Sequence, residues 1–219
     1  MIAVELPVIV IGGGGHAKVL VSALLLRGRT VLGFVDLNLN LPPLNGAPHL
    51  GNDSAVLGYP PDGVQLVNGV GSIGCTRNRQ NVYDRFVQKR YSFATVVHPS
   101  AVVAPEVHIE DGVQVLAGAV VQAGCRLGAN VVVNTGARVD HDCIIDSHAH
   151  VAPGVTICGE VHVGTGAHIG AGATVIQGIR IGAGSVVGAG ALVIRDIPQG
   201  AKVVGVPAAS MPDKRKAQQ

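Results

Sequence analysis

The chain has 219 residues and a formal net charge of +2, which argues against nucleic acid as its main partner because such binding needs clustered positive charge. It contains 31 glycines, few aromatic residues and no tryptophan, a composition that fits a thin core of small aliphatic side chains. No apolar run reaches the roughly 18 residues of a membrane span, and no secretory leader opens the chain, so we expect a cytoplasmic protein.

The first predicted unit is a strand, a glycine-rich turn, a helix and a second strand. An apolar strand covers residues 7–11, and four glycines follow at 12–15. We expect a helix at 19–27 and a second strand at 31–35. This order predicts a βαβ unit with parallel strands.

The turn of this unit has the spacing of a dinucleotide-binding motif. Gly12, Gly14 and Ala17 give G-x-G-x-x-A, and Asp36 closes the second strand about 20 residues later. Glycines let backbone N–H groups approach phosphate, and the helix N-terminus adds positive potential. We therefore expect a nucleotide here, although a glycine-rich turn without a ligand remains the alternative.

The remainder of the front unit carries fewer signals. A further strand at 66–70 runs into Gly71 and Ser72, which either contact phosphate or base or form an ordinary turn. A basic helix follows and ends at Arg90. Only about 95 residues precede the next pattern, which is room for one mononucleotide-binding half and weakens an NAD interpretation.

A strict six-residue repeat begins at Val97. Every sixth residue up to Val193 is Val, Ile or Leu, and the residue four places after each of these is small or apolar. Glycine dominates the position three places after the aliphatic residue, with Asn130 and Asp142 in the same column, as expected for corners with positive φ. A hexapeptide period predicts a parallel β-helix whose triangular coils hold 18 residues and stack about 4.8 Å apart.

His141 is the candidate catalytic residue within the repeat. It occupies an outward position, and the residues one coil below and above it are Ala123 and Gly159, so space surrounds the ring. Asp140 and Asp142 flank it, and a carboxylate partner would raise the imidazole pKa and fix its tautomer, as a general base requires. A solvated surface histidine is the alternative.

Other histidines and cysteines leave two further alternatives. Four more histidines follow in the repeat, and γ-class carbonic anhydrases, which share this repeat, bind zinc through histidines; no pair here has a decisive ligand spacing, so we predict no metal. These histidines are His148, His150, His162 and His168. Cys125 and Cys143 stand one coil apart in the small inward column, which favours stacked core thiols over a disulfide.

The order of these motifs resembles a known family. The glycine-rich βαβ opening precedes hexapeptide coils, the segments His141-Asp142-Cys143 and His150-Val151-Ala152-Pro153-Gly154, and the ending Gly205-Val206-Pro207-Ala208. Together they resemble the bacterial nucleotide-sugar acetyltransferases, a family that includes sialic acid O-acetyltransferases and UDP-4-amino-sugar N-acetyltransferases. The likeness covers essentially the whole chain.

The resemblance implies a left-handed β-helix, a homotrimer, and acetyl-CoA bound in the groove between neighbouring prisms. His141 matches the general base, and Asp142 matches an acidic residue that supports it. The residues implied to lie along the acetyl-CoA are His150, Gly159, Ala171 and Ala189. Those implied to bind the nucleotide are Gly13, Gly14, Gly15, His16, Lys18 and Asp36, to which the front unit adds Gly71 and Ser72.

The sequence thus predicts a nucleotide-binding Rossmann-like half domain at residues 1–96 and a β-helix acetyltransferase domain with a C-terminal tail at 97–219. The expected reaction is N-acetylation of a nucleotide-linked 4-amino-4,6-dideoxy sugar for surface polysaccharide or glycan synthesis, with GDP-perosamine as one candidate. The sugar amine would attack acetyl-CoA directly in a ternary complex. O-acetylation of sialic acid, a metal-dependent hydratase and a non-catalytic scaffold are the alternatives.

Overall fold

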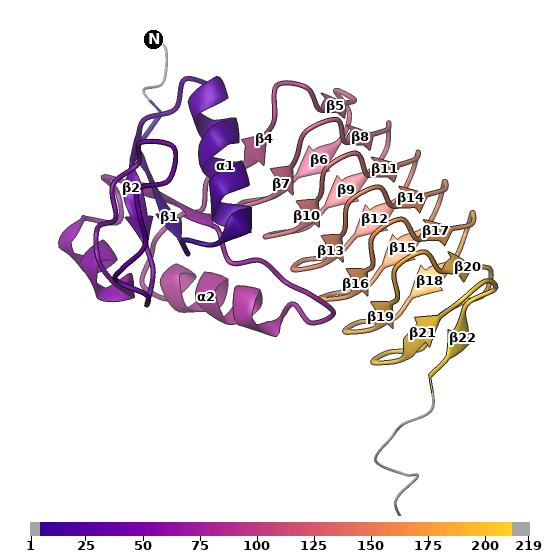
Figure 1. Cartoon of the computed structure of the whole chain (residues 1–219). Coiled ribbons are helices and arrows are strands. Elements are labelled where there is room, and N and C mark those ends of the chain that lie inside the picture. The colour runs from indigo at the N-terminus through magenta and orange to yellow at the C-terminus, as the bar shows by residue number, and fades with distance from the viewer. Residues whose placement is uncertain (1–4, 212–219) are drawn as a thin grey trace, which may run out of the picture.

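The computed structural model describes residues 5–211 and shows an α/β unit set against a long β-prism (Figure 1). The α/β unit contains a parallel sheet of three strands in the order β2-β1-β3. Its elements are β1 (Val8–Ile11), α1 (Gly15–Leu26), β2 (Val31–Val35), the 3₁₀ helix η1 (Asp53–Gly58), β3 (Gln65–Asn68) and α2 (Arg77–Val87).

The predicted βαβ unit is confirmed, with a shorter turn than expected. Helix α1 begins at Gly15 rather than at Val19, because Gly14 already serves as its extended N-cap residue. Gly12 has φ +98°, and a Cβ there would lie 3.2 Å from the carbonyl carbon of Gly69. The turn after β1 therefore needs glycine both for its conformation and for its close packing against the segment that follows β3.

The prism has three walls of short parallel strands. Val132 pairs with His150 and Val133 with Val151, so one coil holds 18 residues, as the hexapeptide period predicts. The fold is a left-handed β-helix. Asn130 and Asp142 occupy corners with φ of 59° and 57°, which confirms their place in the glycine column.

The first wall faces the α/β unit and is the longest. It consists of β4 (Val96–Val97), β7 (Gln114–Val115), β10 (Val132–Val133), β13 (His150–Val151), β16 (His168–Ile169), β19 (Val186–Val187) and β21 (Lys202–Val204), with β22 (Ala209–Ser210) added antiparallel. Strand β21 extends the prism beyond the last residue of the strict repeat.

The other two walls complete each triangle. The second wall consists of β5 (Val102–Val103), β8 (Val120–Val121), β11 (Arg138–Val139), β14 (Thr156–Ile157), β17 (Thr174–Val175) and β20 (Leu192–Val193). The third wall consists of β6 (His108–Ile109), β9 (Arg126–Leu127), β12 (Ile144–Ile145), β15 (His162–Val163) and β18 (Arg180–Ile181).

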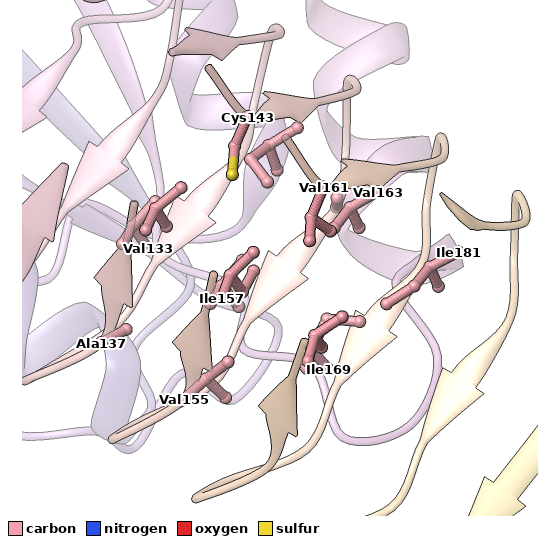
Figure 2. Packing of buried hydrophobic residues seen from close by; sticks show 14 of the residues in the cluster. Val133, Ala137, Cys143, Val155, Ile157, Val161, Val163, Ile169 and Ile181 are labelled. Atoms are coloured by element: carbon pink, nitrogen blue, oxygen red, sulfur yellow. The ribbon is translucent and has the colours of Figure 1, made fainter. Parts of the chain in front are cut away.

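Aliphatic side chains from all three walls fill the interior of the prism. Figure 2 shows residues such as Val133, Ile157 and Ile169 pointing into it, where each is fully buried. Cys125 and Cys143 are buried free thiols within the same core, as the inward column predicts. The prism is therefore a packed support whose chemistry must lie on its outer surface.

A loop ties the two parts of the molecule together. Residues 69–76, here called the finger loop, leave β3, extend along the first wall and return into α2 (Figure 1). Within this loop Thr76 donates from Oγ1 to the carbonyl of Gly166 at 3.0 Å, and Ser72 Oγ lies 2.5 Å from Nδ1 of His150. Among residues 5–211, no helix combines the length and apolar character that crossing a bilayer requires.

Candidate active site

His141 lies at the corner between β11 and β12, on the outside of the prism. Its side chain is 49% exposed, and its ring rests over Gly159 on the next coil. A Cβ at Gly159 would lie only 2.5 Å from Nε2 of His141, so glycine there leaves the space that the ring occupies. The sequence predicts free space around His141, and the structure shows that this space exists because Gly159 has no side chain.

Asp142 fixes the orientation of this imidazole. Its Oδ2 lies 2.9 Å from Nδ1 of His141, while Oδ1 of Asp140 accepts a hydrogen bond from the backbone N–H of His141 at 2.8 Å. The bond to Asp142 raises the pKa of His141 above its usual 6.5, and the negative charge of Asp140 adds to this. With Nδ1 held as a donor, Nε2 is the nitrogen that can accept a proton.

Replacing Asp142 by asparagine should move the pH dependence of turnover. The carboxylate holds His141 protonated up to a higher pH, so the free base accumulates only above that raised pKa. In Asp142→Asn the pKa falls, and the acidic limb of the kcat/KM profile should shift to lower pH while its plateau drops. The profile is measured from pH 5 to 9; an unshifted acidic limb would show that Asp142 does not set the ionisation of the base.

Adding a methyl group at Gly159 should displace the base without unfolding the prism. Gly159 does not have a positive φ, so alanine suits its backbone, and the nearest obstacle to the added methyl group is the His141 ring. Because a misplacement of about 1 Å can cost about 10²-fold in rate, Gly159→Ala should lower kcat by roughly that factor. Gly58→Ala, at a glycine with open space, is the matched control. Equal turnover in both variants would contradict this placement.

A cavity of about 420 Å³ lies between the finger loop and the first wall. Ser72, Ile73 and Gly74 line it from the loop, and no charged residue takes part in its lining. From the prism it is lined by Asn134, His150, Ala152, Pro153, His168, Gly170, Ala171 and Val186 to Ala189. The structure therefore brings together three of the predicted acetyl-CoA residues, His150, Ala171 and Ala189, whereas Gly159 lies at the His141 corner.

His150 is buried and uncharged in this cavity. Burial, together with His168 and Arg79, lowers its pKa to about 2. Its Nε2 lies 3.1 Å from Nδ2 of Asn134, and its Nδ1 lies 2.5 Å from Oγ of Ser72. The ring of His168 meets that of His150 edge to face, with 5.0 Å between centroids. His150 is therefore a hydrogen-bonding group and not an acid at neutral pH.

The glycine-rich turn and Asp36 meet at the carboxyl ends of the parallel strands. The N–H of Gly13 donates to Oδ2 of Asp36 at 2.7 Å, and the N–H of Asn38 donates to Oδ1 at 2.8 Å. Gly14, Gly15 and Lys18 remain exposed at the start of α1. Asp36 thus fixes the conformation of the glycine-rich turn. Gly14 and Gly15 lie outside the carboxyl ends of the parallel strands, which is where α/β sheets of this kind bind their ligands.

His16 turns toward the prism rather than into the open turn. Its Nε2 lies 2.8 Å from Oε1 of Gln114, whose Nε2 donates to the carbonyl of Asn68 at 2.9 Å. Burial and the charge of Arg79 lower the pKa of His16 to about 4. Gly71 lies beside His16, because a Cβ there would be 3.6 Å from the Cβ of His16. His16 therefore links the α/β unit to the prism.

Arg79 is a buried residue that sequence reasoning did not single out. It is 1% exposed and donates from Nη1 to the carbonyls of Asn68 at 2.6 Å and Val70 at 3.1 Å. Burial lowers its pKa to about 9. Arg79 thereby holds the start of the finger loop. The helical register carries a signal for it, because Arg79 precedes Val82, Tyr83 and Phe86 by three, four and seven residues and so lies on the inward face of α2.

His148 and His162, the other two histidines considered as metal ligands, make separate contacts. Nδ1 of His148 lies 3.0 Å from Nδ2 of Asn130, and Nε2 of His162 lies 2.9 Å from Oδ2 of Asp146. In the described part of the chain, no three His, Cys, Asp or Glu side chains are placed so that they could hold a metal ion.

The base and the cavity lie at different corners of one prism. The cavity opens at the corner after the first wall, near Ala152 and Pro153, whereas His141 follows the second wall. The outer face of the second wall lies between them, with a shallow pocket of about 180 Å³ that includes Asp140 and Cys158. Within one chain, then, the proton acceptor and the cavity do not meet.

Known proteins resemble this chain over nearly its whole length. The PglD N-terminal domain family matches residues 7–86. The H141N mutant of perosamine N-acetyltransferase from Caulobacter crescentus, solved with CoA and GDP-perosamine, is 39% identical, with a TM-score of 0.88 over 94% of this chain and 97% of that chain. The acetyltransferase domain of PglB from Neisseria gonorrhoeae, solved with acetyl coenzyme A, is 34% identical, with a TM-score of 0.88 over 94% of this chain and 100% of that one.

A third similar structure is more distant. WeeI from Acinetobacter baumannii is 25% identical, with a TM-score of 0.84 over 94% of this chain and 100% of that chain. No curated protein sequence matches this chain significantly.

Proposed function

Because this chain belongs to the family of bacterial nucleotide-sugar acetyltransferases, we propose that it moves the acetyl group of acetyl-CoA to the amine of a nucleotide-linked 4-amino-4,6-dideoxy sugar. The observation that carries this proposal is the likeness, over 94% of the chain, to an enzyme solved with CoA and GDP-perosamine. The His141–Asp142 pair and an uncharged cavity on the same prism supply a base and a place for a thioester.

In the proposed reaction the neutral amine of the sugar attacks the thioester carbonyl. A C–N bond forms as the C–S bond breaks, and Nε2 of His141 accepts the amine proton, which then passes to the departing CoA thiolate. Asp142 stabilises the imidazolium in between. The backbone N–H of Gly159, which donates to no backbone carbonyl among the described residues, is the proposed donor to the developing oxyanion.

Direct transfer is favoured over a covalent acyl-enzyme. Cys125 and Cys143 are buried inside the prism, and their thiols point to backbone carbonyls, those of Asp140 and Cys158. A thiol in that position cannot reach a bound thioester. The exclusion of these two buried thiols supports direct transfer with both substrates bound together, as in a ternary complex.

The nucleotide is proposed to bind at the open end of the front sheet. The exposed backbone of Gly14 and Gly15 begins helix α1, where N–H groups and the helix dipole favour phosphate. Lys18 lies one turn further along the exposed face. Asp36, ordered by Gly13, is placed to accept hydrogen bonds from a ribose or base.

The distance between base and cavity within one chain supports a homotrimer. The first wall is covered by the front domain, and the third wall presents charged and polar groups such as Arg126 and Arg180. The second wall presents Val102, Val120 and Leu192 on its outer face, together with two threonines and Arg138. We propose that the second walls of three copies meet, so that His141 of one copy faces the cavity of the next.

The substrate is tested by thiol release from acetyl-CoA with a panel of acceptors. The panel contains GDP-perosamine, UDP-linked 4-amino-6-deoxy sugars and free sialic acid. Turnover with one nucleotide-linked amine is the expected result and identifies the base that the front domain binds. Turnover with sialic acid alone would replace the proposal by O-acetylation. No turnover with any acceptor, together with about one zinc per chain, would favour a hydratase.

A further inference from the structure

The hydrogen bonds around His150 determine which of its nitrogens carries the proton. Oδ1 of Asn134 accepts the backbone N–H of Thr135 at 2.8 Å, so the amide group facing His150 is the Nδ2 donor. Nε2 of His150 must therefore accept, and in the neutral ring Nδ1 carries the hydrogen. This hydrogen points to Oγ of Ser72, 2.5 Å away.

The hydroxyl of Ser72 is thereby left with a free hydrogen. Its oxygen already accepts from His150, so its own O–H can donate only elsewhere. Ser72 lines the cavity, where the other surfaces are mostly aliphatic and none is charged. A diphosphate would require cations there, whereas a neutral acyl thioester suits this lining. The acceptor that fits the Ser72 hydroxyl is therefore a carbonyl oxygen.

The position of His150 along the prism axis, relative to that of His141, indicates which carbonyl group of the cofactor accepts this hydrogen bond. His150 follows His141 by nine residues, which is half a coil or about 2.4 Å along the axis. Rotation about an axis parallel to the prism preserves this height, so in the proposed trimer Ser72 and His150 lie level with the base of the neighbouring copy. Ala171 and Ala189 line the same cavity roughly one and two coils further along, where the proposed function would place the rest of the cofactor arm.

We propose that Ser72, oriented by the chain Asn134–His150–Ser72, donates a hydrogen bond to the carbonyl oxygen of the acyl thioester and to the oxyanion that forms from it. This inference rests on the proposed function. It gives the finger loop of the nucleotide-binding domain a direct part in acyl transfer, so that the two domains share one reaction centre.

Ser72→Ala distinguishes this role from a purely structural one, in which Ser72 only holds the finger loop on the prism. Removing one oxyanion donor typically costs about 10² to 10³ in kcat, and we expect that loss with little change in KM for the sugar. Thr76→Ala is the matched control, since Thr76 ties the same loop to the prism but does not line the cavity. Ser72→Thr, which keeps a hydroxyl, should retain most of the activity. Equal losses in Ser72→Ala and Thr76→Ala would overturn the proposal.

A binding measurement keeps this test independent of the acceptor. The wild-type protein should bind acetyl-CoA more tightly than CoA, and Ser72→Ala should reduce that preference by about 2- to 12-fold, the worth of one neutral hydrogen bond. An unchanged preference would overturn the role of Ser72. Failure of the wild-type protein to acetylate any nucleotide-linked amine would instead overturn the proposed function, while the binding comparison still judges Ser72.

Discussion

Replacing His141 by alanine is expected to lower kcat by about 10² to 10⁴, because the amine proton loses its acceptor in the transition state. The fold should survive, since the side chain is half exposed at a corner and removing it leaves no core cavity. Thiol release and thermal unfolding are measured on the same preparations.

His162→Ala is the matched control for this substitution. His162 is also an outward histidine bonded to a carboxylate, Asp146 at 2.9 Å, but it lies on the third wall away from the proposed centre. We expect near wild-type turnover in that variant. Full turnover in His141→Ala would show that His141 is not the general base. Unfolding of His141→Ala would show that the fold of this corner of the prism requires the imidazole ring.

Mixed trimers should recover activity from two inactive chains. His141→Ala removes the base, and Ala171→Trp fills the cavity from an exposed position that tolerates a larger side chain. If each site combines the base of one copy with the cavity of its neighbour, every trimer that contains both chains has one intact site, so about one third of the sites are restored in the selected trimers. The chains carry different affinity tags, are co-expressed and purified through both tags, and are assayed by thiol release.

The control for this experiment combines both substitutions in one chain. Trimers of His141→Ala with the double variant contain no intact base and should remain inactive. Recovery only in the first mixture supports a site between copies. No recovery, in trimers shown to contain both chains, would place base and cavity in the same subunit and contradict the proposed arrangement.

The prism could be predicted in detail because its rule is local. In every coil the same positions require an inward aliphatic side chain and a corner residue that tolerates positive φ. The pattern therefore predicts the strands and the corners of Asn130 and Asp142, and the structure has both residues at positive φ. The outward place of His141 followed from the same register, and so did the burial of Cys125 and Cys143.

The contacts between the α/β unit and the prism could not be predicted in the same way. Ser72 and Thr76 acquire their roles only when the finger loop lies on the first wall, and such packing leaves no periodic mark in the sequence. The family resemblance implies that His16 binds the nucleotide, and nothing in the sequence indicates that its ring bonds Gln114 on the prism. The 3₁₀ helix η1 was missed because it lies in a segment without periodicity.

The bond formed in the product tests the central claim most directly. Purified protein is incubated with acetyl-CoA and GDP-perosamine, and the acetylated product is analysed by mass spectrometry and NMR before and after mild alkaline treatment. We predict one acetyl group on the amino nitrogen, as an amide that resists the alkali. An alkali-labile ester on a sugar hydroxyl, or the absence of any acetylated nucleotide-linked amine across the acceptor panel, would contradict N-acetylation by this protein.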